Sequence, residues 1–146
     1  MKTKINFHAR WPHISGQGAV LIYDRHLDSI CPGFIRKFPL RYAVSGGEGL
    51  KDAARFFAHM ERLAKITAKA DLPRPRIIAM GGGSVGDFSG FVASVWKRGT
   101  PLVHIPSTWL AAMDSAHGGK TALNLSGIKN QIGTFYSAES VHLIQP

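Results

Sequence analysis

Several features are scarce in this sequence, and each scarcity excludes a class of protein. The 146 residues include one cysteine, Cys31, which excludes an internal disulfide framework and favours a reducing compartment. The seven histidines fall into neither His-Glu-x-x-His nor Cys-x-x-Cys spacing, so the sequence predicts no metal site within the chain. The longest apolar stretches, residues 18–23 and 91–96, are far shorter than the roughly 20 residues that a membrane span needs.

Acidic side chains are also few. Nine aspartates and glutamates stand against 18 lysines and arginines, which gives a formal net charge of +9. This excess favours anionic partners by electrostatic steering. The basic residues form no stripe interleaved with aromatics, so we expect phosphorylated small molecules or an acidic companion domain as partners, and no nucleic acid. Residues 1–10 lack the apolar run of a secretory signal, so we expect a cytoplasmic protein with no membrane partner.

Three short apolar runs, at residues 18–24, 76–80 and 102–105, have the β-branched composition of buried strands. Their near-continuous apolarity is typical of parallel strands covered on both faces. A long helix between the first two runs is predicted by apolar residues at steps of three and four: Leu50, Ala53, Phe57, Met60 and Ala64. The sequence therefore predicts one α/β domain over residues 1–146, with a Rossmann-like, open, mostly parallel sheet and helices on both of its faces.

Local signals bound the other predicted elements. The Ser-x-x-Glu pattern at residues 45–48 is a capping box and predicts the start of the long helix. A second helix is predicted over residues 88–97, ended by Gly99, and a third over residues 108–115, with Ser107 as its N-cap. The last two predicted elements are strands, at residues 132–136 and 141–144.

Four polar or glycine-rich segments each lie at the end of a strand-like run. These residues are Asp24, Ser45 to Glu48, Gly81 to Asp87, and Ser107 with Thr108. Since the carboxyl ends of parallel strands meet at one edge of a sheet, we expect these four loops to converge on one crevice.

The pattern Gly-x-Gly-x-x-Gly at residues 81–86 satisfies the dinucleotide fingerprint. Its glycines admit backbone amides to a pyrophosphate, and the following helix N-terminus adds a positive field. The usual acidic residue about 20 positions downstream is missing, because the next carboxylate after Asp87 is Asp114. The segment is thus either a nucleotide site, with Asp24 or Glu48 serving the ribose, or simply a tight strand-to-helix turn.

The segment Gly-Gly-Lys-Thr at residues 118–121 imitates the end of a P-loop but lacks the required upstream glycine and preceding strand. Its Lys120 is therefore either a phosphate contact or an exposed loop lysine. Plain structural roles also stay open for the other candidates: caps for Ser107 and Thr108, helix positions for Glu48, Lys51, Asp114 and Arg98, and a turn for Lys129 and Asn130.

Taken together, the motifs resemble the N-terminal domain of 3-dehydroquinate synthase and the wider sugar phosphate cyclase family. Six ordered blocks carry the resemblance: Gly-Gly-Gly-Ser-Val-Gly-Asp at 81–87, Lys-Arg-Gly at 97–99, Ile-Pro-Ser-Thr-Trp-Leu-Ala at 105–111, Met-Asp-Ser at 113–115, Gly-Gly-Lys-Thr at 118–121 and Lys-Asn-Gln-Ile-Gly-Thr-Phe-Tyr at 129–136. Upstream, Asp24-x-His26 and Gly47-Glu48-x-x-Lys51 match the family more loosely.

The resemblance implies that the chain binds NAD⁺. The implied cofactor contacts are Asp24, Glu48, Lys51, Gly82, Gly83, Ser84, Val85, Gly86, Asp87, Ser107, Thr108 and Lys129. It also implies that Asp114, Lys120 and Asn130 contact a phosphorylated substrate, and that Arg98 reaches the substrate phosphate in the partner subunit of a homodimer.

The family's reaction converts a seven-carbon sugar acid phosphate (DAHP) into 3-dehydroquinate, in the shikimate pathway of aromatic amino acid biosynthesis. A ring hydroxyl is transiently oxidised by NAD⁺, phosphate is eliminated, the hydride returns, and the ring closes by an aldol step. In the family, a second, helical domain holds a divalent metal, zinc or cobalt. The resemblance therefore implies a cofactor-binding half that is inactive by itself.

Departures from the family pattern leave the substrate open. Ser84 and Ser107 are mild changes, whereas His117 and the segment Ser-Gly-Ile at residues 126–128 fall on the substrate side. The alternatives are the matching domain of another sugar phosphate cyclase, a polyol dehydrogenase relative, and a non-catalytic anion-binding module that kept only the fold.

Overall fold

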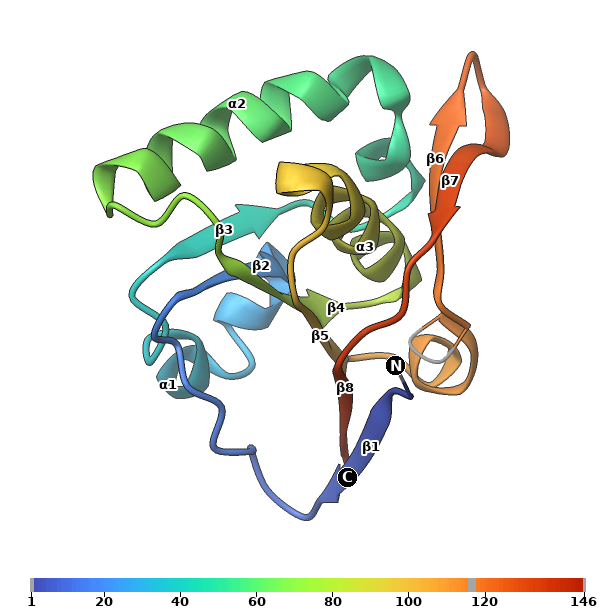
Figure 1. The fold of residues 1–146 in the computed structure, drawn as a ribbon. Coiled ribbons are helices and arrows are strands. Elements are labelled where there is room, and N and C mark those ends of the chain that lie inside the picture. Colours follow the sequence, from blue (N-terminus) through green and yellow to red (C-terminus); the bar gives the residue numbers. More distant parts are fainter. Residues whose placement is uncertain (1, 116–117, 146) are drawn as a thin grey trace.

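The computed structural model describes residues 2–115 and 118–145, so His117 lies outside the described residues. At its centre is a six-stranded sheet with the strand order β1-β8-β5-β4-β2-β3, in which every neighbouring pair is parallel (Figure 1). The strands are β1 Lys4–His8, β2 Ala19–Asp24, β3 Arg41–Val44, β4 Arg76–Gly81, β5 Leu102–Pro106 and β8 Ser140–Ile144. The predicted Rossmann-like parallel sheet is confirmed.

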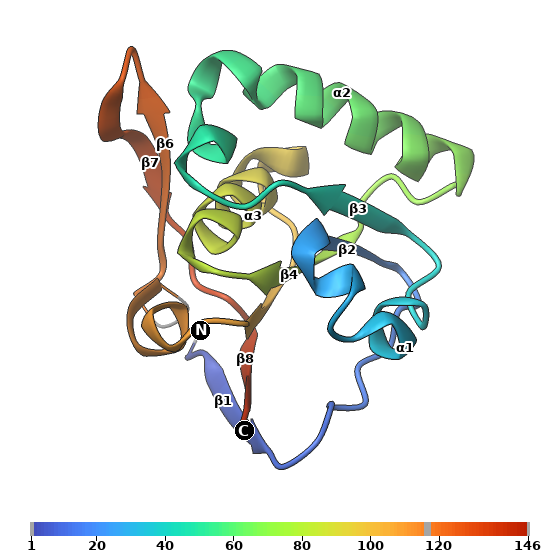
Figure 2. The ribbon, with the colours of Figure 1, turned by 180° about the vertical axis from the view of Figure 1, so that it is seen from behind.

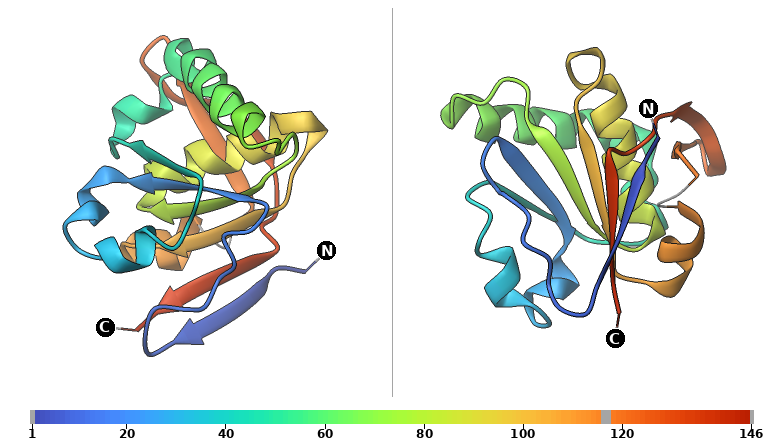
Figure 3. Two further views of the ribbon diagram at one scale, coloured as in Figure 1. Left: turned by 90° about the vertical axis from the view of Figure 1, so that its left-hand side faces the viewer. Right: turned by 60° about the horizontal axis from the view of Figure 1, so that its bottom comes forward.

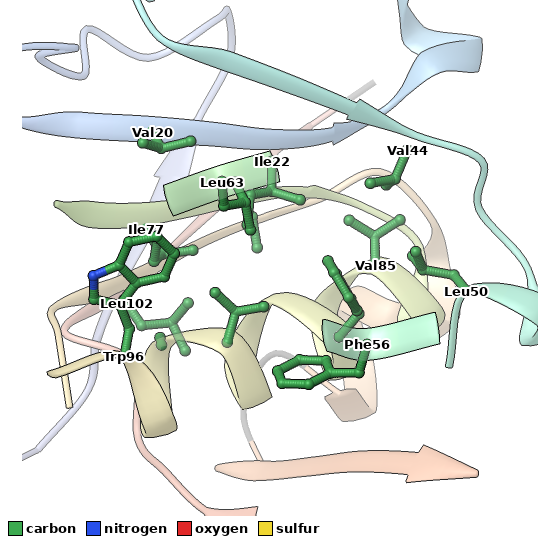
Figure 4. Packing of buried hydrophobic residues seen from close by; sticks show 14 of the residues in the cluster. Val20, Ile22, Val44, Leu50, Phe56, Leu63, Ile77, Val85, Trp96 and Leu102 are labelled. Atoms are coloured by element: carbon green, nitrogen blue, oxygen red, sulfur yellow. The ribbon is translucent and has the colours of Figure 1, made fainter. Parts of the chain in front are cut away.

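Helices cover both faces of the sheet, but unequally. The helices α2 (Ala53–Lys69) and α3 (Gly83–Val95) lie over one face, and the short helix α1 (Pro32–Ile35) with the 3₁₀ turn η1 (Arg25–Asp28) lies over the other (Figures 1 and 2). Successive residues of β2 and β4 alternate between two buried clusters, one on each face. Figure 4 shows the cluster under α2 and α3, where Val85, Phe56 and Leu63 meet the strands.

The long helix begins later than predicted, and its predicted buried face is only partly right: Leu50, Ala53 and Met60 contact the core, whereas Phe57 and Ala64 are exposed. Gly47 has φ 114°, a conformation suited to glycine, and no side-chain cap forms at the Ser-x-x-Glu pattern, so α2 does not begin there. Instead a 3₁₀ turn, η2 (Glu48–Lys51), precedes α2, and Asp52 caps α2 by accepting a hydrogen bond from the Ala54 N–H. Phe57, predicted to be in the core, is 75% exposed, whereas Phe56 is 5% exposed.

Two neighbouring apolar stripes on α2 explain this error. Phe56 rather than Phe57 points inward because its ring packs edge-on against Phe88 and Phe91 of α3. Leu63 and Thr67 follow on the same buried face. The sequence pattern contained both stripes, and the contact with α3 selected one.

The second predicted helix is confirmed, with an earlier start at Gly83, immediately after the glycine turn. It ends at Val95, and the 3₁₀ turn η3 (Trp96–Arg98), in which Lys97 and Arg98 have positive φ, leads to Gly99, which has φ 122°. The third predicted helix is a short helical turn followed by the π-helical turn η4 (Ala111–Ser115). Its cap is Thr108, whose Oγ1 accepts from the Ala111 N–H, so the prediction of Ser107 as the N-cap was wrong.

A hairpin that the sequence analysis only half predicted stands beside α3. It consists of β6 (Lys120–Leu125) and β7 (Ile128–Phe135), an antiparallel pair separate from the main sheet (Figure 1). The predicted strand at residues 132–136 is the second half of β7, and β6 was missed. The Gly-Gly-Lys-Thr segment therefore leads into a strand, not into the helix of a P-loop.

Strand β1 was also missed, because its side chains are mostly exposed and carry no buried alternation. It pairs with β8 from the other end of the chain, as Figure 3 shows. Among the described residues, no helix is long and apolar enough to cross a membrane.

Candidate functional site

The four loops predicted to converge do meet at the carboxyl edge of the sheet. The chain leaves β2 toward β3 on one side of the sheet and leaves β4 toward β5 on the other, so the loops after β2 and β4 flank a topological switch point. The loops after β2 and β3 touch, because a Cβ atom at Gly46 would collide with Oδ2 of Asp24. The other oxygen of Asp24, Oδ1, accepts a hydrogen bond from the His26 N–H at 3.0 Å.

The glycine-rich turn opens α3 without a side-chain cap. The N-cap residue of this 13-residue helix is Gly82, which has no side chain. The first backbone N–H groups of the helix therefore receive no hydrogen bond from a capping side chain. The Val85 side chain is fully buried in the core, and its contribution to any ligand is limited to its backbone. Ser84 ties the turn to the next loop by accepting a hydrogen bond from the Gly47 N–H at 2.8 Å.

Loop β5–η4 packs against this turn. The Ser107 N–H donates to the Gly81 carbonyl at 2.8 Å, and a Cβ atom at Gly82 would lie 3.3 Å from Cγ2 of Thr108. Ser107 and Thr108 are both exposed at the crevice. The structure therefore brings these two predicted residues to the start of α3.

Lys51 is the centre of the site. It is 3% exposed, although it lies in a four-residue turn near the surface. Its Nζ donates to Oδ2 of Asp87 at 2.9 Å and to Oδ1 of Asn130 at 2.6 Å, and lies 3.9 Å from Oε2 of Glu48. The interpretation of Lys51 as a solvated helix lysine was therefore wrong, because its ammonium joins three elements that are far apart in sequence: the turn η2, helix α3 and strand β7.

Burial and charge act in opposite directions on Asp87. Its removal from water raises the pKa of the carboxyl above the ordinary value, and the hydrogen bond and charge of Lys51 oppose that rise. Burial has the larger effect, even though the two groups form a 2.9 Å ion pair. The ionised form of Asp87 is therefore stabilised by Lys51 against the effect of burial.

Asn124 is a site residue that the sequence analysis missed. Its Nδ2 donates to Oε2 of Glu48 at 2.9 Å, and its Oδ1 accepts from the Asn130 N–H at 3.0 Å. The hydrogen bond from Asn124 lowers the pKa of Glu48, assisted by the charges of Lys51 and Lys129. A sequence signal did exist, because Ser126 and Gly127 form a turn between two strand-like runs that begins two residues after Asn124.

The predicted substrate residues line one cavity of about 400 Å³ between α3, η4 and the hairpin. Asp114, Lys120 and Asn130 contribute to its wall together with Asp87. Asn130 has φ 56°, a left-handed conformation that asparagine tolerates better than most residues. Exposed Lys129 is its neighbour on β7.

Arg98 is not part of this cluster. It lies in η3, beyond the C-terminal end of α3, whereas the cavity lies near the start of that helix. Within one chain, therefore, Arg98 does not line the cavity with Lys120, and its predicted role across a dimer interface stays a prediction.

Within residues 2–115 and 118–145, no three histidine, cysteine, aspartate or glutamate side chains are grouped so that they could hold a metal ion. The prediction that a metal is bound by another domain stays a prediction.

Comparison with known proteins adds to this geometry. The family model for the 3-dehydroquinate synthase N-terminal domain matches residues 41–145. A 3-dehydroquinate synthase of Saccharolobus solfataricus is 36% identical over 131 residues, which cover 88% of this chain and 36% of that protein.

Two solved structures have the same fold. The 2-epi-5-epi-valiolone synthase of Streptomyces hygroscopicus, with NAD⁺ and Zn²⁺ bound, superposes with a TM-score of 0.82 at 21% identity, over 99% of this chain and 43% of that one. A 2-deoxy-scyllo-inosose synthase complexed with carbaglucose-6-phosphate, NAD⁺ and Co²⁺ superposes with a TM-score of 0.76 at 26% identity, over 96% of this chain and 42% of that one.

The chain spans about a third of the length of the Saccharolobus relative and less than half of either solved structure. The family match nevertheless extends over most of the chain, including every strand-end loop of the crevice except the one after β2. The chain belongs to the 3-dehydroquinate synthase N-terminal domain family, as its motifs predicted.

Proposed function

We propose that this chain is the NAD-binding half of a 3-dehydroquinate synthase-like lyase, which converts DAHP into 3-dehydroquinate with elimination of phosphate. One observation carries the proposal. Buried Lys51 joins Asp87 of the glycine-turn helix to Asn130 of the hairpin, so a cofactor crevice and a polar cavity share one wall.

The residues at the crevice fit a dinucleotide. The uncapped amides at the start of α3 are suited to a pyrophosphate, and the carboxylate of Asp24, at the end of the adjacent strand β2, is suited to ribose hydroxyls. Bound NAD⁺ would supply a hydride acceptor for a substrate hydroxyl and would later return the hydride. The proposed contacts are Asp24, Glu48, Lys51, Gly82 to Asp87, Ser107, Thr108 and Lys129.

The hairpin cavity fits a phosphorylated substrate. We assign Lys120 and Asn130 to the phosphate and to the charge that develops when it leaves, because a fixed cation and a fixed amide stabilise such charge. Asp114 lines the same cavity and would orient substrate hydroxyls. Arg98 would reach the phosphate in the second subunit of a homodimer.

The metal belongs, in this proposal, to a part of the enzyme outside this chain. A zinc or cobalt ion there would polarise the hydroxyl that is oxidised. The large apolar side chains around η4 and the end of β7 are exposed, as expected of a surface that another domain covers: Trp109, Leu110, Met113 and Phe135.

Calorimetric titration of the purified chain with NAD⁺ tests the cofactor half of the proposal. We expect saturable binding that is lost in Gly83→Val, whose side chain would block backbone approach to the pyrophosphate. Gly33→Val is the matched control, because Gly33 lies in another helix with open space at its Cβ position. Equal NAD⁺ affinity in both variants would contradict the assignment of the glycine turn.

Phosphate release from DAHP, measured with and without added Zn²⁺, tests the second half. We expect none from this chain in the presence of NAD⁺, because the residues proposed here supply no metal-polarised hydroxyl. Phosphate release by the chain itself would show that the reaction does not need a metal held by a second domain, and this part of the proposal would be wrong.

Another sugar phosphate cyclase is the second candidate. It is favoured by the departures at residues 126–128, at the turn of the hairpin and the start of β7. It is also favoured by the carbaglucose-6-phosphate bound in the 2-deoxy-scyllo-inosose synthase structure. The two candidates differ in the ligand that the cavity prefers. If the chain loaded with NAD⁺ binds carbaglucose-6-phosphate more tightly than DAHP, the second candidate replaces the first.

A further inference from the structure

A second polar cavity, of about 450 Å³, lies between the edge strand β3 and helix α2. Three arginines line it: Arg25 from η1, and Arg55 and Arg62 from α2. Residues of the loop after β3, including Gly46, complete its wall. None of the residues proposed to bind NAD⁺ or substrate lines this cavity.

Helix α2 carries basic side chains along the face that lines the cavity. Arg55, His59 and Arg62 are spaced i, i+4 and i+7, so they share one face of α2. Glu61, the one acidic residue of the helix, lines a different pocket. The basic face is thus separated from the helix's own carboxylate.

Carboxylates do little to neutralise this cavity. No aspartate or glutamate lines it, and among residues 2–115 and 118–145 neither Arg25 nor Arg62 has an ion-pair partner within 4.0 Å. Arg55 lies 3.8 Å from Asp52, but both side chains are largely exposed, so the pair is weak. Guanidinium groups with weak carboxylate partners or none, placed around a concave surface, are a suitable receptor for an anion with several oxygens.

Two neutral hydrogen-bonding groups stand beside the arginines. The Tyr42 hydroxyl and Nδ1 of His59 lie 2.7 Å apart, and both residues are half-buried. Burial, with the charges of Arg62 and Arg55, lowers the pKa of His59, which favours the neutral form of its ring. A bound anion would offset the arginine charges and raise the pKa of His59, so the titration of His59 indicates whether the cavity is occupied.

We propose that this cavity is a binding site for a small phosphate-bearing molecule, separate from the NAD⁺ crevice and from the Lys120 cavity. A phosphate group presents several oxygens to convergent guanidiniums, and the cavity volume accommodates a small metabolite. The site shares the loop of residues 45–49 with Glu48, so its occupant contacts the segment that leads into the Lys51 turn.

Site-resolved NMR titration of the chain with inorganic phosphate, at constant ionic strength, tests the proposal. We expect saturable shifts of the His59 ring and of the Gly46 and Gly49 amides, with a rise in the pKa of His59. In Arg62→Gln the affinity should be roughly tenfold weaker, the loss expected for one charge-assisted hydrogen bond. Arg55→Gln serves as the second variant if Arg62→Gln fails to fold.

Two controls separate this site from simple charge effects. Lys65→Gln removes one charge from the same helix but lies outside the cavity, so phosphate affinity should change less than about twofold. Lys120→Gln should leave the His59 titration unchanged. The proposal is overturned if phosphate affinity weakens equally in Lys65→Gln and Arg62→Gln. It is also overturned if the His59 shifts are lost in Lys120→Gln, or if phosphate shifts other resonances but not those of His59.

Discussion

The crevice at the end of the parallel sheet and the β6–β7 hairpin beside it are held in place by different means. The loops of the crevice continue strands whose side chains are almost wholly buried, such as β2 and β4. The hairpin is a separate two-stranded sheet whose second strand is exposed along nearly its whole length. Two-stranded hairpins are marginally stable by themselves, so the hairpin depends on contacts with its neighbours.

Those contacts are made by β6, which packs along α3, and by two asparagines of the hairpin. Leu123 packs into the cluster under α3, and Asn130 and Asn124 form hydrogen bonds with Lys51 and Glu48. The comparison shows that the proposed cofactor side is fixed by the hydrophobic core, whereas the proposed substrate side is fixed by the packing of β6 on α3 together with a small polar network. Three substitutions test this difference.

Lys51→Met should have the largest effect, because it leaves the buried carboxylate of Asp87 without its ion-pair partner. We expect a loss of about 3 kcal/mol in the free energy of unfolding, measured with urea, and a further rise in the pKa of Asp87. The hairpin should also lose hydrogen-exchange protection. Lys65→Met, on the exposed side of α2, is the control and should change stability by less than about 0.5 kcal/mol.

Gly133→Ala should disturb the hairpin selectively. A Cβ atom at this position would collide with the backbone carbonyl of Thr121 on the paired strand, which cannot move without opening the ladder. We expect a loss of about 2 kcal/mol, in the range for overpacking. Amide exchange should accelerate in β6 and β7 while β4 and β5 stay protected. Uniform acceleration in both sheets would mean that the hairpin and the main sheet unfold as one unit.

Asn124→Ala should have the smallest effect, about 1 kcal/mol at neutral pH, from the loss of two exposed hydrogen bonds. The folded state holds the pKa of Glu48 below its ordinary value of 4.5, so this stabilisation is present above that pH and is lost as the pH falls through the folded pKa. The stability difference between wild type and variant should therefore shrink on acidification. A difference that is constant from pH 7 to acid would rule out the contact with ionised Glu48 as its source.

Local patterns predicted more of the fold than of the site. The strands at residues 18–24, 76–80 and 102–105 were predictable because a strand buried on both faces is apolar throughout, whatever lies beside it. The start and face of α2 were not, because the Ser-x-x-Glu pattern and the Phe56–Phe57 pair each permit two local structures. The φ of Gly47 and the packing of Phe56 on Phe88 decided between them.

The candidate site likewise has features that the sequence predicted and features that it did not. The sequence by itself determined which loops follow the strands, and hence that Asp24, the glycine turn and Thr108 share one edge of the sheet. Only the tertiary structure decided that Lys51 is buried between Asp87 and Asn130, that Asn124 joins Glu48, and that Arg25, Arg55 and Arg62 surround one cavity. The reason is that the positions of buried strands follow from short-range apolar patterns, whereas the partners of a charged side chain are set by contacts between segments up to 79 positions apart.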